Sequence, residues 1–214
     1  MLNNLIDWII ENGGLYVMLF IIFAETGLLL GFFLPGDSLL FTAGIFINKI
    51  SAEFYHVHYS IIILLIIIAS VLGNMAGYWF GNKTGPILYE RKETFLFRRK
   101  HLMRAHDFYE QYGKATIFAA KFLPIIRTFA PIVAGVVKMP KATFTFYNII
   151  GSIVWVTVMV LGGHFLENWV QNKYGFSLKD HIDVIAIIII LITTLPVLFK
   201  LFFGKKPAVN TDLK

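Results

Sequence analysis

The feature that most constrains the fold is a set of long apolar runs that are almost free of charge. Two of them, 61–82 and 142–163, contain no Asp, Glu, Lys or Arg, and a third, 184–203, contains only Lys200. A helix of about 20 apolar residues matches the thickness of the hydrocarbon core of a bilayer. Each run therefore predicts a membrane-spanning helix, and the chain is expected to fold with lipid around it.

Composition supports a bilayer as the solvent. The chain has 214 residues, of which 57% are hydrophobic and 15% are charged, whereas about 25% of the residues of soluble domains are charged. The length suits a single domain. Cysteine is absent, which excludes disulfides and thiolate chemistry.

The first segment, 1–14, is expected to be an amphipathic helix at the membrane interface. It contains Asp7 and Glu11 but no Lys or Arg, so it lacks the basic start of a signal peptide. Its apolar residues fall on one helical face. These residues are Leu2, Leu5, Ile6, Ile9 and Ile10.

Two further apolar segments, 15–47 and 115–137, are interrupted and carry charges near their middle. The residues that interrupt them are Pro35, Gly36, Pro124 and Pro131. Irregular backbone at membrane depth is tolerated only where it is buried in protein or lines a water-filled cavity. We therefore predict that both segments are re-entrant helical hairpins, which enter the membrane, turn and leave on the same side.

The two predicted hairpins share an order of features. Each has a charged residue near its middle, then proline, then an Ala-Gly pair that ends in Gly44 or Gly135, and each precedes a spanning helix. Such a unit crosses the membrane an odd number of times, so two copies must be inverted relative to each other. The predicted fold is an all-α polytopic membrane protein with two opposed re-entrant hairpins and about three to five further membrane helices, organised like an inverted repeat.

Basic residues gather between 83 and 114 and again at the C-terminus. The positive-inside rule places this middle loop and the C-terminal tail, 204–214, in the cytoplasm, and leaves the side of the N-terminus open. The net charge of +6 is then explained by loops beside anionic lipid. We do not expect binding to nucleic acid.

Glu25 and Asp37 give the strongest indication of function. An ionisable group inside a membrane segment costs several kcal/mol unless it is paired or hydrated. A buried carboxyl group takes up a proton more readily than an exposed one, which suits proton exchange near neutral pH. The structural alternative is that either acid pairs with Lys121 or Arg127 and locks the hairpins together.

Lys121 and Arg127 are the complementary cations. They flank Pro124, and a segment broken by proline need not place them on different faces. The guanidinium group offers a planar fork suited to phosphate, whereas the ammonium group of lysine is a point charge. Two cations at membrane depth predict the binding of an anionic headgroup; the alternative is again pairing with the two acids.

Two other patterns have simpler explanations. Gly73, Gly77 and Gly81 recur at every fourth position, a stripe that lets another helix approach closely, and no strand precedes it as in a phosphate-binding loop. His56 and His58 lack an evident third metal ligand, and an aromatic belt at the interface explains them better. Neither a metal nor a cofactor is expected.

In combination, these motifs resemble the DedA family of bacterial membrane proteins, also called the SNARE-associated or VTT-domain family. The resemblance runs from about residue 14 to residue 163. The segments that carry it are 25–27, 33–40 with Ala43 and Gly44, 121–131 with Ala134 and Gly135, and then Gly151 and Trp155.

The resemblance implies opposed re-entrant hairpins and movement of lipid across the bilayer. Bacterial members are linked to the recycling of undecaprenyl phosphate, the lipid carrier for cell-envelope polymers, and to homeostasis of the proton motive force. Eukaryotic relatives resemble phospholipid scramblases. Two acids and two arginines of the hairpins matter in the family. Glu25 and Asp37 match the acids and Arg127 the second arginine, while Lys121 stands in place of the first and lacks its bidentate fork.

We therefore expect a lipid transporter or flippase of the bacterial cytoplasmic membrane that moves a lipid phosphate such as undecaprenyl phosphate. Lys121 and Arg127 would bind the phosphate, and Glu25 and Asp37 would exchange protons. One alternative is a proton-coupled exchanger of small ions or drugs that uses the same acids. Another is a lipid-phosphate phosphatase, but such enzymes need a histidine beside the cations, and all six histidines lie outside both hairpins. An enzyme is therefore not expected.

Overall fold

The computed structural model describes residues 14–27, 36–54, 56–90 and 116–178. The helices are α2 (Gly14–Gly27), α3 (Gly36–Ile45), α4 (Ile47–Glu53), α5 (Tyr59–Glu90), α7 (Thr116–Ala120), α8 (Pro124–Val136) and α9 (Lys141–Tyr174). Because these described ranges contain no strand, the predicted all-α class is confirmed for them. The predicted segments 184–203 and 204–214, and all of 1–14 except Gly14, lie outside the described residues.

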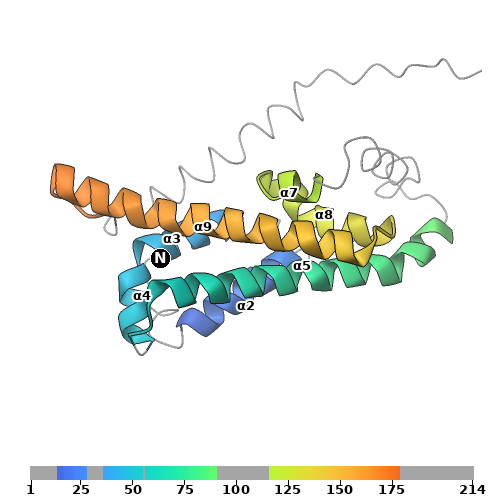
Figure 1. Cartoon of the computed structure of the whole chain (residues 1–214), viewed down its shortest axis with the longest axis horizontal. Coiled ribbons are helices and arrows are strands. Elements are labelled where there is room, and N and C mark those ends of the chain that lie inside the picture. Colours follow the sequence, from blue (N-terminus) through green and yellow to red (C-terminus); the bar gives the residue numbers. More distant parts are fainter. Residues whose placement is uncertain (1–13, 28–35, 55, 91–115, 179–214) are drawn as a thin grey trace, which may run out of the picture.

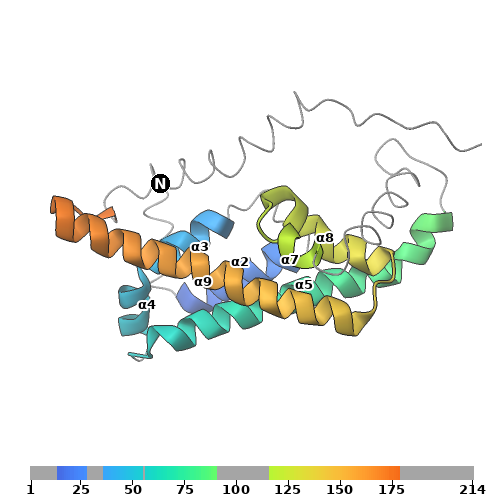
Figure 2. The ribbon, with the colours of Figure 1, turned by 45° about the horizontal axis from the view of Figure 1, so that its top comes forward.

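Two long helices, α5 and α9, run antiparallel beside each other through the molecule (Figures 1 and 2). Residues Tyr59–Gly85 of α5 and the whole of α9 are long and apolar enough to cross a membrane, as judged by length and composition. Both helices extend beyond the predicted limits of 82 and 163. In α9 the end is set by Gly175, whose φ of 73° is the left-handed conformation typical of a residue that terminates a helix.

The interrupted segments lie as pairs of shorter helices against these two long ones. In the first pair, α2 packs on α5 and α3 packs on α9; in the second, α7 packs on α9 and α8 packs on α5. Each pair therefore contacts both long helices. If a unit is a pair plus the long helix that follows it in the chain, the second helix of each pair lies on the long helix of the other unit. An inverted repeat predicts this exchange. The turn of the first segment falls in 28–35, outside the described residues, and the turn of the second, at 121–123, joins α7 to α8. That both segments re-enter the membrane stays a prediction.

The prolines of the two interrupted segments have different structural roles. The chain leaves the helical conformation at 121–123, and α8 begins with Pro124 in its first turn, where the missing N–H costs no hydrogen bond. Pro131, which we expected to interrupt the segment, instead lies inside α8, which continues to Val136. Its position is explained by packing, since its Cβ lies beside Gly77 of α5. Pro35 lies outside the described residues.

Glycines bring the helices into contact backbone to backbone. A Cβ atom on Gly73 would collide with α2, and one on Gly81 would collide with the backbone of α8. Gly77 lies between these two contacts, so one stripe on α5 receives two helices. On the other long helix, Gly163 lies against the backbone of α3. Small residues of this kind allow close helix approach in membranes.

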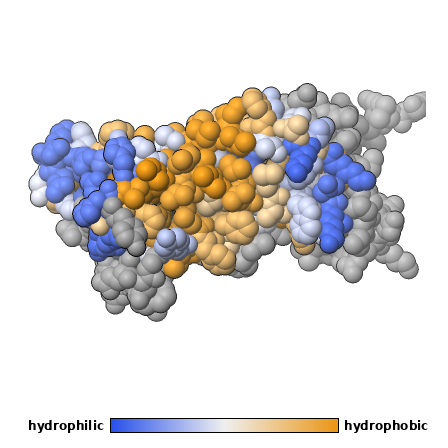
Figure 3. Space-filling model, turned by 60° about the horizontal axis from the view of Figure 1, so that its bottom comes forward, coloured by the Kyte–Doolittle hydropathy of each residue, from blue (hydrophilic) through white to orange (hydrophobic). Residues whose placement is uncertain are grey.

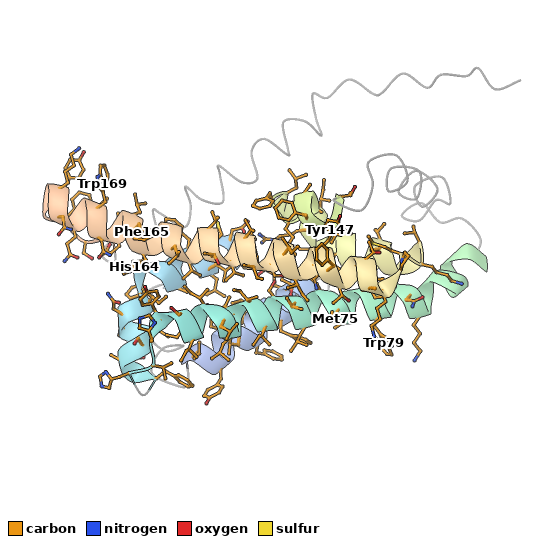
Figure 4. The ribbon with its side chains drawn as sticks, viewed as in Figure 1. Met75, Trp79, Tyr147, His164, Phe165 and Trp169 are labelled. Atoms are coloured by element: carbon orange, nitrogen blue, oxygen red, sulfur yellow. The ribbon has the colours of Figure 1, made fainter. Side chains whose placement is uncertain are left out.

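A band of exposed apolar side chains covers the middle of one face of the bundle. Figure 3 shows this band between hydrophilic ends. At the two ends, Lys83 lies over the ring of Trp79 and Lys173 over the ring of Trp169, at 5.1 and 4.9 Å from the ring centres (Figure 4). Tryptophan with a lysine that reaches outward is typical of a membrane interface. At about 1.5 Å per residue, Tyr59 and Trp79 lie roughly 30 Å apart, the thickness of a bilayer core.

Two neighbouring glycines test the close packing of α9 on α3. In Gly163→Ala, the new Cβ would collide with the backbone of Phe41, and we expect a cost of about 1–3 kcal/mol from overpacking. In Gly162→Ala, the new Cβ would meet only a ring atom of Phe41 at 3.8 Å, so this variant should match the native protein or exceed it, because Ala favours helix over Gly. Thermal unfolding of the full chain in detergent should give a lower midpoint for Gly163→Ala alone. Equal midpoints for the two variants would contradict the packing.

Candidate functional site

Arg127 lies at the centre of the site, between the two predicted acids. Its Nη2 donates to Oε1 of Glu25 at 2.7 Å, and its Nη1 donates to Oδ1 of Asp37. The three residues come from α8, α2 and α3 and are 8%, 0% and 8% exposed. The pairing that the sequence left as the structural alternative is therefore present for Arg127, and it joins the two interrupted segments to each other.

Gly36 allows the two acids to share one guanidinium group. It is the first residue of α3, directly before Asp37, and the carboxylate of Glu25 occupies the space that a Cβ on Gly36 would fill. Any other residue would push the carboxylate away. The Pro-Gly-Asp sequence therefore needs glycine because the side chain of Glu25 from α2 must reach the start of α3.

Trp155 of α9 forms the floor of this cluster. The guanidinium carbon of Arg127 lies 4.7 Å from the centre of its ring system, and its indole N–H donates to Oδ1 of Asp37 at 3.1 Å. An aromatic face below a desolvated cation contributes favourable energy. The sequence pointed to Trp155 only through the family resemblance. Its contacts with both members of an ion pair were not predicted.

Lys121 does not join this cluster. It is buried, and within the described part of the chain no carboxylate lies within ion-pair distance of it. Its Nζ donates to Oγ of Ser152 at 2.5 Å, and its alkyl chain crosses Gly151, where a Cβ would lie 3.0 Å from Cδ. The two predicted cations are thus in different environments. Both lie against one face of α9, because Ser152 and Trp155 are less than one helical turn apart.

A group of small polar residues between α5 and α9 was missed by sequence reasoning. Asn74 Nδ2 donates to the carbonyl of Ser70 at 2.8 Å, and Asn148 Nδ2 donates to the carbonyl of Val71 at 3.2 Å. The hydroxyls of Ser70 and Ser152 lie 3.3 Å apart. The signal in the sequence was a pair of polar residues four positions apart in each of two otherwise apolar runs.

The remaining polar candidates lie away from the cations. His58 contacts the hydroxyl of Ser60 near the start of α5, and the described ranges hold no group of three residues that could bind a metal. Glu167 is a buried acid that the sequence analysis did not single out. It accepts hydrogen bonds from the Ser177 hydroxyl and the Leu178 N–H at 2.6 and 2.8 Å, so it holds the chain that follows α9.

The site contains two acidic and two basic side chains, whose formal charges sum to zero. Glu25 and Asp37 are balanced by Arg127 and Lys121, although of these two cations only the arginine contacts the acids. A buried charge without compensation is strongly unfavourable. An added anion is therefore accommodated best if a carboxylate is neutralised at the same time. Nε of Arg127 is buried and has no hydrogen-bond partner in the described structure, so the arginine retains an unused donor.

Comparison with known proteins agrees with these features. The family model of the VTT domain matches residues 34–165. Protein DedA of Escherichia coli (strain K12) is 35% identical over 207 residues, which cover 96% of this chain and 90% of that protein. Inner membrane protein YqjA of the same organism is 30% identical over 199 residues, which cover 91% and 88%. An uncharacterized membrane protein of Mycobacterium tuberculosis is 34% identical over 181 residues, which cover 85% and 75%. No solved structure matches the chain.

The fold and the site define a helical membrane protein with a buried cluster of opposite charges between interrupted helices. The chain belongs to the DedA family, as its VTT domain and its identity to DedA show. The matched VTT region includes Asp37, Lys121, Arg127 and Trp155, and Glu25 lies before it.

Charge balance in the site predicts an asymmetry between the two cations. Arg127→Met leaves two buried carboxylates unpaired and should destabilise the protein by about 3–5 kcal/mol. Lys121→Met removes a cation that contacts a hydroxyl rather than an acid, and should cost clearly less. Adding Glu25→Gln and Asp37→Asn to Arg127→Met should restore most of the lost stability. Thermal midpoints in detergent would show this order. Equal losses in the two methionine variants, or no recovery in the triple variant, would contradict the assignment of the acids to Arg127.

Proposed function

We propose that this protein is a transporter of anionic lipids in the bacterial inner membrane and that it moves a lipid phosphate by coupling to protons. Undecaprenyl phosphate is the first candidate substrate. The location is supported by the relative YqjA, which is named an inner membrane protein, and the basic middle loop and C-terminus are expected on the cytoplasmic side. The proposal is transport, without catalysis and without a cofactor.

The observation that carries the proposal is the presence of two buried cations at mid-depth, of which only one contacts acids. Lys121 is 6% exposed and Arg127 is 8% exposed. Ser70, which lies beside Ser152 and hence near Lys121, is about midway along α5 between Tyr59 and Trp79. Transporters hold their substrates near the bilayer midplane. A buried cation that contacts no acid at that depth, beside a second one, supports a site for an anion.

The surroundings of the cations favour a lipid over a small soluble ion. Between Lys121 and Arg127 the chain carries Phe122, Leu123 and Ile126, which are 46%, 43% and 49% exposed. The buried cations are thus flanked in sequence by side chains that suit contact with hydrocarbon. A lipid phosphate combines both properties, because its headgroup is an anion and its chains remain in the bilayer. This observation favours a lipid over the small ions or drugs of the alternative exchanger.

The coupling to protons follows from the contacts of Arg127. Both of its terminal nitrogens donate to Glu25 and Asp37, so a phosphate that takes two hydrogen bonds from these nitrogens competes with the carboxylates and causes one of them to withdraw. A withdrawn carboxylate at this depth is stable only in its protonated form. Binding of the lipid phosphate would therefore be accompanied by proton uptake at one of the acids. Release of the lipid on the other side would return the arginine to the carboxylates and free the proton.

A transport assay in liposomes tests the proposal. The full chain would be reconstituted with a fluorescent short-chain prenyl phosphate, and a quencher in the outer medium would report transfer between leaflets with and without a pH gradient. We expect the prenyl phosphate to move and the rate to depend on the gradient. Phosphatidylcholine with the same fluorophore should not move. Equal movement of both lipids would contradict a carrier selective for lipid phosphate.

Variants of Lys121 are the second part of the transport assay. Lys121→Met should slow transport at least about tenfold, since loss of a charged hydrogen bond costs about 1.5–3 kcal/mol. Lys121→Arg keeps the charge and restores the family residue, so it should retain transport. The control is Lys141→Met, an exposed lysine at the start of α9, which should behave like the native protein. Normal transport by Lys121→Met would remove this residue from the site.

A further inference from the structure

Two serine hydroxyls in the long helices are arranged differently from those of Thr26 and Thr84. Thr26 and Thr84 donate to backbone carbonyls four residues earlier in their own helices, at 2.9 and 2.8 Å. This local bond is a common way for a helix to satisfy a hydroxyl group. Ser70 of α5 and Ser152 of α9 instead face each other across the contact between the two helices, and both are fully buried. Their hydroxyl groups therefore point into the protein interior.

The hydroxyl protons of these serines are weakly engaged. Oγ of Ser152 already accepts from Nζ of Lys121, so its own proton can go only to Oδ1 of Asn148 at 3.4 Å or to Ser70 at 3.3 Å. Both distances exceed the usual 2.7–2.8 Å of a hydrogen bond from a hydroxyl to an oxygen. The site therefore contains a buried ammonium group next to two hydroxyl donors that lack a short acceptor in the described structure.

The neighbouring asparagines are, by contrast, fixed in place. The amide groups of Asn74 and Asn148 both donate to backbone carbonyls of α5. Neither amide donates to a serine hydroxyl, and the one asparagine oxygen near a hydroxyl, Oδ1 of Asn148, lies 3.4 Å from Oγ of Ser152. Donors from three segments thus converge, with Lys121 from the turn between α7 and α8, Ser70 from α5 and Ser152 from α9.

We propose that Lys121, Ser152 and Ser70 form an oxyanion subsite that binds one oxygen of a phosphate group, while Arg127 binds another oxygen of the same group. The inference rests on the proposed function and names the residues that select its substrate. A phosphate monoester presents three strong acceptor oxygens, which allows one for the arginine and one for this subsite, both of which lie against α9. A phosphodiester carries a single negative charge in place of the about −1.5 to −2 of a monoester, so it compensates the two buried cations less completely, and the site favours the monoester.

Binding measurements on the full chain in detergent test the subsite. The probes are a short-chain prenyl phosphate, a phosphodiester lipid of equal chain length and inorganic phosphate, with titration calorimetry as the readout. We expect Ser152→Ala to weaken binding of the prenyl phosphate about tenfold and to reduce the preference for monoester over diester. Ser70→Ala should act in the same direction while leaving the contact between Lys121 and Ser152 intact, so it serves as the second variant if Ser152→Ala is unstable. Thr84→Ala, whose hydroxyl bonds only to its own helix, should bind like the native protein.

The outcomes separate the subsite from the transport proposal. If the native protein binds the prenyl phosphate and both serine variants bind it equally well with unchanged selectivity, the subsite is wrong and lipid transport stands. If inorganic phosphate binds as tightly as the prenyl phosphate and both serine variants weaken this binding, the oxyanion subsite is supported. The proposal that its ligand is a lipid is then wrong. If the native protein binds neither phosphate, both proposals fail.

Discussion

The structure depends on the ion pairs of Arg127 with Glu25 and Asp37 in a medium that cannot hydrate them. A guanidinium group buried among apolar helices is tolerable only if its charge and its donors are matched. Here α2 supplies one carboxylate, α3 the other, and α9 supplies the indole of Trp155. Four helices are therefore joined at one side chain. The same contacts that stabilise the fold are those with which a bound anion would compete, so stability and the proposed function draw on the same residues.

The close packing of the helices gives this cluster a rigid frame. Gly44 and Gly163 bring α3 onto α9, and Gly135 and Gly81 bring α8 onto α5, in each case with backbone against backbone. The contact of α3 with α9 and the contact of α8 with α5 are equivalent, as expected if the two units are related as an inverted repeat. Each interrupted segment is thereby fixed to the long helix of the opposite unit. Asp37 and Arg127 lie near the starts of α3 and α8, and the glycine contacts lie near the ends of the same helices.

Much of this arrangement was predictable from the sequence, because the cost of charge in an apolar run singles out the same residues. Glu25, Asp37, Lys121 and Arg127 stand out for that reason, and the glycine stripe on α5 stands out by its regular spacing. The sequence did not reveal which cation meets the acids. Two cations that flank a break at Pro124 can face either way, and the choice depends on Gly151, which leaves room for the alkyl chain of Lys121 across α9. Ser70 and Ser152 were overlooked because a single serine in an apolar helix normally bonds to its own backbone. Pro131 was misjudged because a proline that faces a glycine on a neighbouring helix can remain inside a helix.

The central claim is that a phosphate displaces a carboxylate from Arg127 and that the carboxylate takes up a proton. It is tested most directly by counting the protons bound with the ligand. Titration calorimetry of the full chain with a short-chain prenyl phosphate, repeated in buffers of different ionisation enthalpy, gives this number. The variant with Glu25→Gln and Asp37→Asn provides the reference for protons exchanged by the ligand itself. We expect the native protein to take up about one proton more per phosphate than this variant does, as charge balance at a buried site requires. Tight binding with the same proton count in both proteins would show that the acids are structural partners of Arg127 and do not carry protons with the lipid.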